Sequence, residues 1–189
     1  MPSQFTSNQT NTHHVFGAKV EFFSPVDFYD DATFQKVSFT DLTVSNTFDS
    51  TGTASVKEVF EKVHINSEDA GGYLHIDVNN GSLHNYTQNF GTNFTLNVRA
   101  DSKTTLDSVM KNGTSLVITL MIPMGGSAFY LSDASTTGFK IDGTAQSVKW
   151  ILAQPPNAGF IDSINSYTFA IIKNSKDNYT VLGSLSRFG

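Results

Sequence analysis

The chain has 189 residues, a length that suits one domain or a small domain with an extension. Charged residues make up only 15% of it, the formal net charge is −5, and 16 of its residues are phenylalanine. This acidic and weakly charged composition argues against a nucleic-acid partner, because phosphate binding needs a basic surface. Cysteine is absent, which excludes disulfide bridges, thiolate metal sites and a cysteine nucleophile.

Residues 1–14 are polar and offer almost nothing to bury. We expect them to form a flexible tail that becomes ordered only where a partner docks it. The longest apolar run, "LVITLMIPM" at residues 116–124, is far shorter than a bilayer span, so no membrane insertion is expected.

A six-residue pattern begins at residue 15 and fades after about Val44. Phenylalanine recurs at Phe16, Phe22, Phe28 and Phe34. An even step keeps side chains on one side of an extended chain, whose period is two, and it does not fit the 3.6-residue period of a helix. Pro25 also argues against a helix. The pattern therefore predicts short extended segments that share an inward ring.

Segments this short cannot bury a phenylalanine ring within one chain, and seven or so hexads would give only about two turns of a single-chain β-helix. Three chains that wind together would supply one ring each to every layer. We therefore predict that residues 15–56 form the β-rich shaft of a homotrimer; an ordinary β-meander is the alternative. The predicted interface residues are Phe16, Phe22, Phe28, Phe34, Val20 and Val26.

Residues 57–189 are predicted to fold as an antiparallel β-sandwich of the jelly-roll type, which makes the whole chain all-β. Strand signals recur at roughly ten-residue intervals, separated by turn clusters such as "IDGT". One helical turn is expected within residues 103–113, with threonine as a cap and Gly113 as its end. The predicted strands are residues 55–65, 73–78, 94–100, 115–122, 127–131, 138–142, 147–152, 166–172 and 179–185.

The sequence offers little chemistry, and we predict no catalytic residue, no metal site and no cofactor. His75 and Asp77 point the same way on a predicted strand, a pair that more often makes a surface hydrogen bond than a metal site. Trp150 shares a strand face with Val148 and Leu152 and is expected in the core. The ligand-binding residues are not identified by any motif, although exposed tyrosines near loops would suit that role: Tyr73, Tyr86 and Tyr130.

Residues 138–189 contain the pair Lys149–Trp150, a Gly/Ala/Pro-rich turn at residues 155–159, the aromatic pair Tyr167 and Phe169, and a closing segment that ends at Phe188. This run resembles the C-terminal domain of bacteriophage virion proteins, especially those of marine and cyanobacterial phages. The hexads are similar to tail-fibre shafts. The resemblance implies a trimeric structural protein on the virion, and it supplies no catalytic residues.

The first functional interpretation is a phage tail fibre or short fibre. Residues 1–14 would anchor it to other virion proteins, residues 15–56 would form the shaft, and residues 57–189 the head. Weak contacts of several heads with a host-surface glycan or outer-membrane protein would add up through avidity. The alternative is a trimeric capsid decoration protein. A polysaccharide depolymerase is less favoured, because the chain is short and no carboxylate pattern supports it.

Replacing Phe22 and Phe28 together by serine (Phe22→Ser with Phe28→Ser) should weaken assembly far more than the surface change Lys140→Ser. The reason is that each buried ring contributes roughly 1.5–3 kcal/mol, and three chains would lose two rings each. Light scattering at micromolar concentration measures the mass. A monomeric mass for the unmodified chain would contradict the predicted trimer.

Overall fold

The computed structural model describes residues 44, 52–55, 57, 59–67, 71–134 and 136–189. The chain divides into two compact units, Met1–Ala54 and Ser55–Gly189, and all the named helices and strands lie in the second. The predicted tail, most of the predicted shaft and all six predicted interface residues lie outside the described residues: Phe16, Val20, Phe22, Val26, Phe28 and Phe34. Their arrangement remains a prediction.

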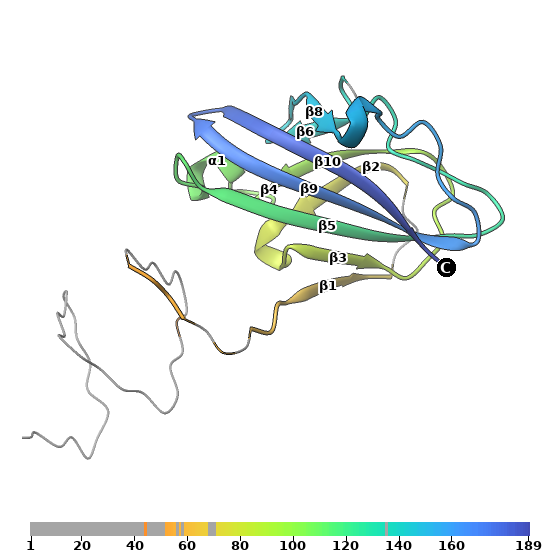
Figure 1. The fold of residues 1–189 in the computed structure, drawn as a ribbon, viewed down its shortest axis with the longest axis horizontal. Coiled ribbons are helices and arrows are strands. Elements are labelled where there is room, and N and C mark those ends of the chain that lie inside the picture. Colours follow the sequence, from red (N-terminus) through yellow and green to blue (C-terminus); the bar gives the residue numbers. More distant parts are fainter. Residues whose placement is uncertain (1–43, 45–51, 56, 58, 68–70, 135) are drawn as a thin grey trace, which may run out of the picture. The chain divides into compact units, whose positions relative to one another are not determined.

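The second unit is built from two β-sheets that share one core (Figure 1). Sheet A has the strand order β1-β3-β5-β9-β10-β8, and sheet B has the order β2-β4-β6-β7. The strands of sheet A are β1 (Val63–Asn66), β3 (Leu83–Tyr86), β5 (Ser115–Met124), β9 (Ser163–Ser175), β10 (Asn178–Phe188) and β8 (Val148–Trp150). Those of sheet B are β2 (Gly72–Asp77), β4 (Phe94–Arg99), β6 (Phe139–Ile141) and β7 (Thr144–Ala145). Three short helical turns complete it: η1 (Val78–Asn80), α1 (Leu106–Val109) and η2 (Ile151–Ala153).

The first six strands alternate between the two sheets, with the odd-numbered strands in sheet A and the even-numbered ones in sheet B. The pairs that these six strands form with one another are parallel and join segments far apart in sequence. Val63 pairs with Leu83 in sheet A, and Leu96 pairs with Phe139 in sheet B. The chain thus winds as a stack of flattened coils, each of which buries its apolar side against the other sheet, as in a β-solenoid.

The later strands close this stack with antiparallel pairing. β9 pairs antiparallel with β5 and with β10, and β6 pairs antiparallel with β7, whereas β8 lies parallel to β10. In Figure 1, β3, β5, β9 and β10 run side by side across the near side, with β2 and β4 behind them.

The strand-rich fold predicted from the sequence is confirmed, but the described sheets are mixed and not antiparallel throughout. Five of the pairings between named strands are parallel: β1/β3, β3/β5, β2/β4, β4/β6 and β8/β10. Alternation of apolar residues along a strand shows which side is buried, but it does not identify the neighbouring strand. An antiparallel jelly roll and a coiled stack therefore have the same local pattern.

Individual elements follow the sequence closely in some places and not in others. The "IDGT" turn joins β6 to β7, with positive φ at both Asp142 (50°) and Gly143 (81°), as a type I′ hairpin turn requires. Thr105 caps α1 by accepting a hydrogen bond from the Ser108 amide at 3.2 Å. The strand expected at residues 127–131 is absent apart from an isolated bridge at Leu131, and β3 was not predicted.

The core contains a continuous series of aromatic rings that crosses from one sheet to the other. Successive centroids lie 5.1–6.4 Å apart, mostly edge to face, an arrangement that stabilises aromatic clusters. Phe169 also contacts Phe139 in sheet B and Trp150 in sheet A. The series runs through Tyr86, Phe90, Phe94, Tyr167 and Phe169.

Trp150 is buried, with 8% of its surface exposed, which confirms the sequence prediction. Its indole N–H donates to the carbonyl of Ala134 at 3.0 Å, and Gly183 on β10 leaves room for its ring. Leu152, expected on the same face, is instead 84% exposed. The reason is that β8 ends at Trp150 and the chain turns in η2, where Leu152 has a φ of 55°.

We expect Trp150→Ala to lower the free energy of unfolding by about 3–5 kcal/mol, because it leaves a cavity beside Phe169 and an unpaired Ala134 carbonyl. The neighbouring change Ile151→Ala should shift it by less than about 0.5 kcal/mol, since Ile151 is 65% exposed. Urea unfolding followed by circular dichroism measures both. Equal midpoints for the two variants would contradict the assigned core.

Candidate ligand-binding and interaction surfaces

A pocket of about 370 Å³ lies beside the loop that connects β8 to β9. Its walls combine the apolar side chains of Pro155, Pro156 and Phe160 with the amide side chains of Gln154 and Asn157. Trp150 and Leu185 contribute from β8 and β10. All of its lining residues are uncharged, so the pocket suits a neutral ligand with one apolar face and hydrogen-bonding groups.

The loop around this pocket is held by specific backbone features. Leu152 and Ala153 both have φ of 55°, a left-handed conformation that is costly for side chains other than glycine and is concentrated at functional sites. A Cβ at Gly159 would clash with the carbonyl oxygen of Phe129, so glycine permits a close approach there. The Asp162 amide donates to the carbonyl of Gly125 at 3.0 Å. The pocket is therefore pre-formed.

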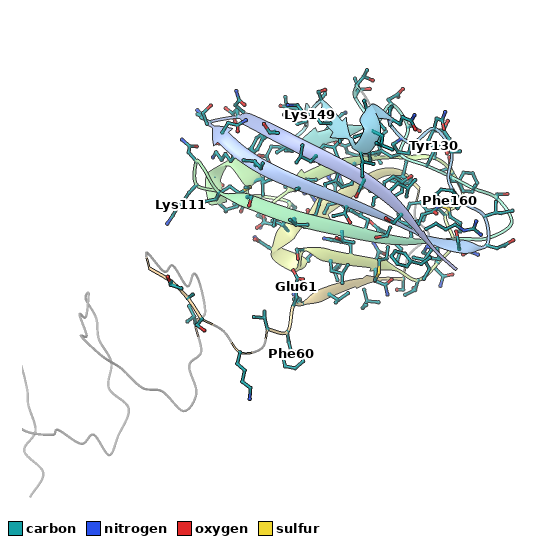
Figure 2. All side chains as sticks on the ribbon, in the orientation of Figure 1. Phe60, Glu61, Lys111, Tyr130, Lys149 and Phe160 are labelled. Carbon is teal, nitrogen blue, oxygen red and sulfur yellow. The ribbon has the colours of Figure 1, made fainter. Side chains whose placement is uncertain are left out.

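Phe160 is the most prominent aromatic side chain of this region. It is 39% exposed, and the guanidinium carbon of Arg187 lies 5.7 Å from its ring centroid. Figure 2 shows Phe160 and Tyr130 at one end of the unit and Lys111 at the other. The end that carries Phe160 therefore presents an aromatic side chain for ligand contact.

Of the three tyrosines expected to be exposed, Tyr73 is 46% exposed and Tyr130 is half-buried. Tyr86 is buried, with 3% of its surface exposed, so the expectation of an exposed side chain was wrong there. It lies on β3, where His84 and Tyr86 alternate inward with Leu83 and Asn85 outward. Recognising that alternation as a strand would have placed Tyr86 in the core.

The outer face of sheet B carries polar and charged side chains that pair across neighbouring strands. Asp77 forms a salt bridge with Arg99 at 2.6 Å, and His75 Nδ1 lies 3.4 Å from the amide nitrogen of Asn97. The ammonium group of Lys140 lies 5.2 Å from the ring centroid of Tyr73. His75 and Asp77 thus have separate cross-strand partners on β4, Asn97 and Arg99.

The outer face of sheet A, here called the neutral face, is formed by side chains that alternate with the buried ones along β1, β3, β5, β9 and β10. All of them are apolar, hydroxyl or amide side chains. Two exposed charges lie on the described strands of this sheet outside that set: Lys149 on the edge strand β8, opposite Leu182, and Arg187 on β10. The members are Val63, Ile65, Leu83, Asn85, Ser115, Val117, Thr119, Met121, Pro123, Ile164, Ser166, Thr168, Ala170, Ile172, Asn174, Thr180, Leu182, Ser184, Ser186 and Phe188.

A buried ion pair attaches α1 to the β9–β10 hairpin. Lys173 is 5% exposed; its ammonium group donates to the carbonyls of Asp107 and Met110 and lies 2.8 Å from the Asp107 carboxylate. The Lys173 hydrogen bond is the main cause that lowers the pKa of Asp107. Burial, with the nearby Asp107 charge, raises the pKa of the Tyr179 hydroxyl, which donates to Asp107 at 3.1 Å. The Lys173–Asp107 ion pair therefore stabilises the packing of α1 against the β9–β10 hairpin.

A second pocket, of about 300 Å³, lies beside sheet B and is lined by Arg99, Lys103, Asp101 and Asp142 among others. Its carboxylates already accept backbone hydrogen bonds. Asp101 accepts from the amides of Lys103 and Thr104 at 2.8 and 2.9 Å. Asp142 accepts from the first amides of α1, at 2.7 Å from Leu106. The carboxylates of Asp101 and Asp142 therefore stabilise the local backbone through these hydrogen bonds.

Comparison of the chain with protein-family models, with curated protein sequences and with solved structures gives no match. Across residues 71–134, 136–189 and the shorter described stretches, no three His, Cys, Asp or Glu residues are grouped as a metal site. The same residues include no helix long and apolar enough to cross a membrane.

His84 is the buried titratable group that lacks a partner for one of its ring nitrogens. It is 2% exposed, its Nε2 has no hydrogen-bond partner among the described residues, and its ring lies 5.1 Å from that of His64. Burial, with a smaller contribution from His64, lowers the pKa of His84 to about 4. The imidazole is therefore neutral in the folded protein above that pH.

This lowered pKa predicts a pH-dependent stability. Between pH 6.5 and about 4 the unfolded chain binds a proton at His84 that the folded chain does not. The free energy of unfolding should therefore fall as the pH drops through this window, by on the order of 2–3 kcal/mol. Urea unfolding at a series of pH values measures it. His84→Leu should flatten the dependence in this window and the control His75→Gln should keep it; identical slopes would refute the assignment.

Proposed function

We propose that this chain is a non-enzymatic structural protein of a bacteriophage virion, a homotrimeric tail fibre that contributes to attachment to the host surface. The observation that carries the attachment role is the uncharged, pre-formed pocket beside Phe160. Its volume of about 370 Å³ lies within the range of roughly 300–1,000 Å³ that is typical of small-molecule sites.

The lining of this pocket fits a surface glycan or a short loop of an outer-membrane protein. The flat side chains of Pro155, Pro156 and Phe160 offer an apolar platform, while Gln154 and Asn157 offer amide donors and acceptors. A single site of this kind binds weakly. Three copies on one fibre, and several fibres on one particle, turn weak binding into firm attachment.

The trimeric part of the proposal is supported by the six-residue spacing of Phe16, Phe22, Phe28 and Phe34, whose rings need partners from other chains. The resemblance of residues 138–189 to phage virion proteins supports the location on a virion. In this arrangement residues 1–14 dock on other virion proteins, and the strand-rich second unit forms the head.

Soluble full-length protein should compete with the phage that carries it for adsorption to host cells. We expect Phe160→Ala to reduce this competition about tenfold or more, because a central aromatic contact is a typical binding hot spot. The matched control is Tyr73→Ala, which removes another exposed aromatic side chain from the outer face of sheet B. Adsorption assays with increasing competitor measure the effect.

Excess soluble protein that leaves adsorption unchanged, together with fragile shells in particles that lack the protein, would contradict the attachment role. That result would support a capsid decoration role. Release of reducing sugar from host polysaccharide would instead contradict the non-enzymatic assignment.

A further inference from the structure

The neutral face of sheet A differs from the outer face of sheet B in a way that solvent exposure alone does not explain. Sheet B carries the cross-strand ion pair Asp77–Arg99, whereas the side chains of the neutral face are uncharged. The exposed charges on the strands of sheet A are Lys149, at the β8 edge beside Leu182, and Arg187, which alternates with the neutral face on β10. We infer that the neutral face is the surface that the second units of the three copies of this chain turn toward the trimer axis, where neighbouring copies pack against each other. This inference rests on the homotrimer of the proposed function.

Large apolar side chains are exposed across this face. Ile65 is 58% exposed, Val117 52%, Leu182 44% and Phe188 59%. Two sets of register neighbours form apolar patches, Val117 with Ala170 and Leu182, and Pro123 with Ile164 and Phe188; exposed apolar patches mark interaction sites.

The strand register arranges these side chains in rows that cross the sheet. Val117, Ala170 and Leu182 are direct neighbours on β5, β9 and β10. A hydroxyl row lies beside them, in which the Thr119 and Thr168 oxygens are 3.3 Å apart. The result is a face of apolar and hydroxyl rows, with the charge of Lys149 at the β8 end of the row that contains Leu182.

A second copy of the same chain is the partner that this face fits best. Two neutral faces can approach without like-charge repulsion, even though each chain carries a net charge of −5. A strongly basic or acidic partner would find no opposite charge to pair with. The five strands give a face on the order of 600–800 Å², from strand spacings of about 4.8 Å and rises of about 3.3 Å per residue, close to what one partner buries in a standard interface.

The absence of cysteine allows a direct test in the full-length chain. Thr168→Cys places a single thiol at the centre of the neutral face, and Thr95→Cys places one on the outer face of sheet B. Both threonines are half-buried in the single unit and lie on inner strands, so the two variants form a matched pair. The measurement is the rate of maleimide labelling at micromolar concentration, normalised to the rate of the same variant in denaturant, together with the mass by light scattering.

We expect Thr168→Cys to react about tenfold more slowly than Thr95→Cys, because the core of an interface is packed as densely as a protein interior. Adding Val117→Glu should restore fast labelling, since each copy then brings a carboxylate to a surface that excludes water, and its register neighbour Ala170 offers no opposite charge. Val117 is 52% exposed in the single unit, and an unchanged circular dichroism spectrum verifies that this variant remains folded.

Equal labelling rates in a protein with the mass of three chains would overturn this inference and leave the proposed trimer intact. A monomeric mass would contradict both this inference and the proposed trimer. Slow labelling of Thr168→Cys that Val117→Glu does not relieve would also overturn the inference, because another segment or protein would then cover the face.

Discussion

The aromatic contacts of Tyr167 and Phe169 on β9 are the interaction on which the rest of the second unit depends. β9 is the strand that pairs both with β5, from the coiled stack, and with β10, from the closing hairpin. Its inward rings contact Phe94 and Phe139 in sheet B. These contacts join the parallel coils, the hairpin and the opposite sheet in one core. Without these ring contacts, each coil would bury only the apolar side that faces its neighbouring coil. That burial is insufficient for a stable solenoid.

Because the inner faces are filled by this core, function is left to the outer surfaces, and these differ in chemistry. The charged groups of α1 and the hairpin, Asp107 and Lys173, are used to hold the two sheets at one end. The uncharged pocket beside Phe160 belongs to the loop between β8 and β9. The proposed ligand contact and the proposed assembly would thus use surfaces that Asp107 and Lys173 do not occupy.

The sequence predicted the features that depend on local pattern. Examples are the strand at residues 94–100, the turn in the "IDGT" stretch and the burial of Trp150. It did not predict the parallel pairing of β2 with β4, because period-two alternation is the same for either kind of neighbour. The pocket was also missed. It depends on left-handed backbone at Leu152 and Ala153 and on a close approach at Gly159, and none of these has a local signal in an "ILAQPPNAG" stretch.

The coiled stack and the six-residue repeat both have to bury the apolar side chains of short extended segments. They differ in the length of chain between one segment and the next. In the stack, a strand meets its neighbour only after the chain has crossed to the other sheet and returned, so Val63 pairs with Leu83 and Gly72 with Phe94. A hexad is far too short for that return, since six extended residues span only about 20 Å. In the proposed trimer, the rings of the hexads would take their neighbours from other chains. The neutral face likewise exposes apolar side chains in the second unit. Packing between copies would bury these side chains as well as the rings of the hexads.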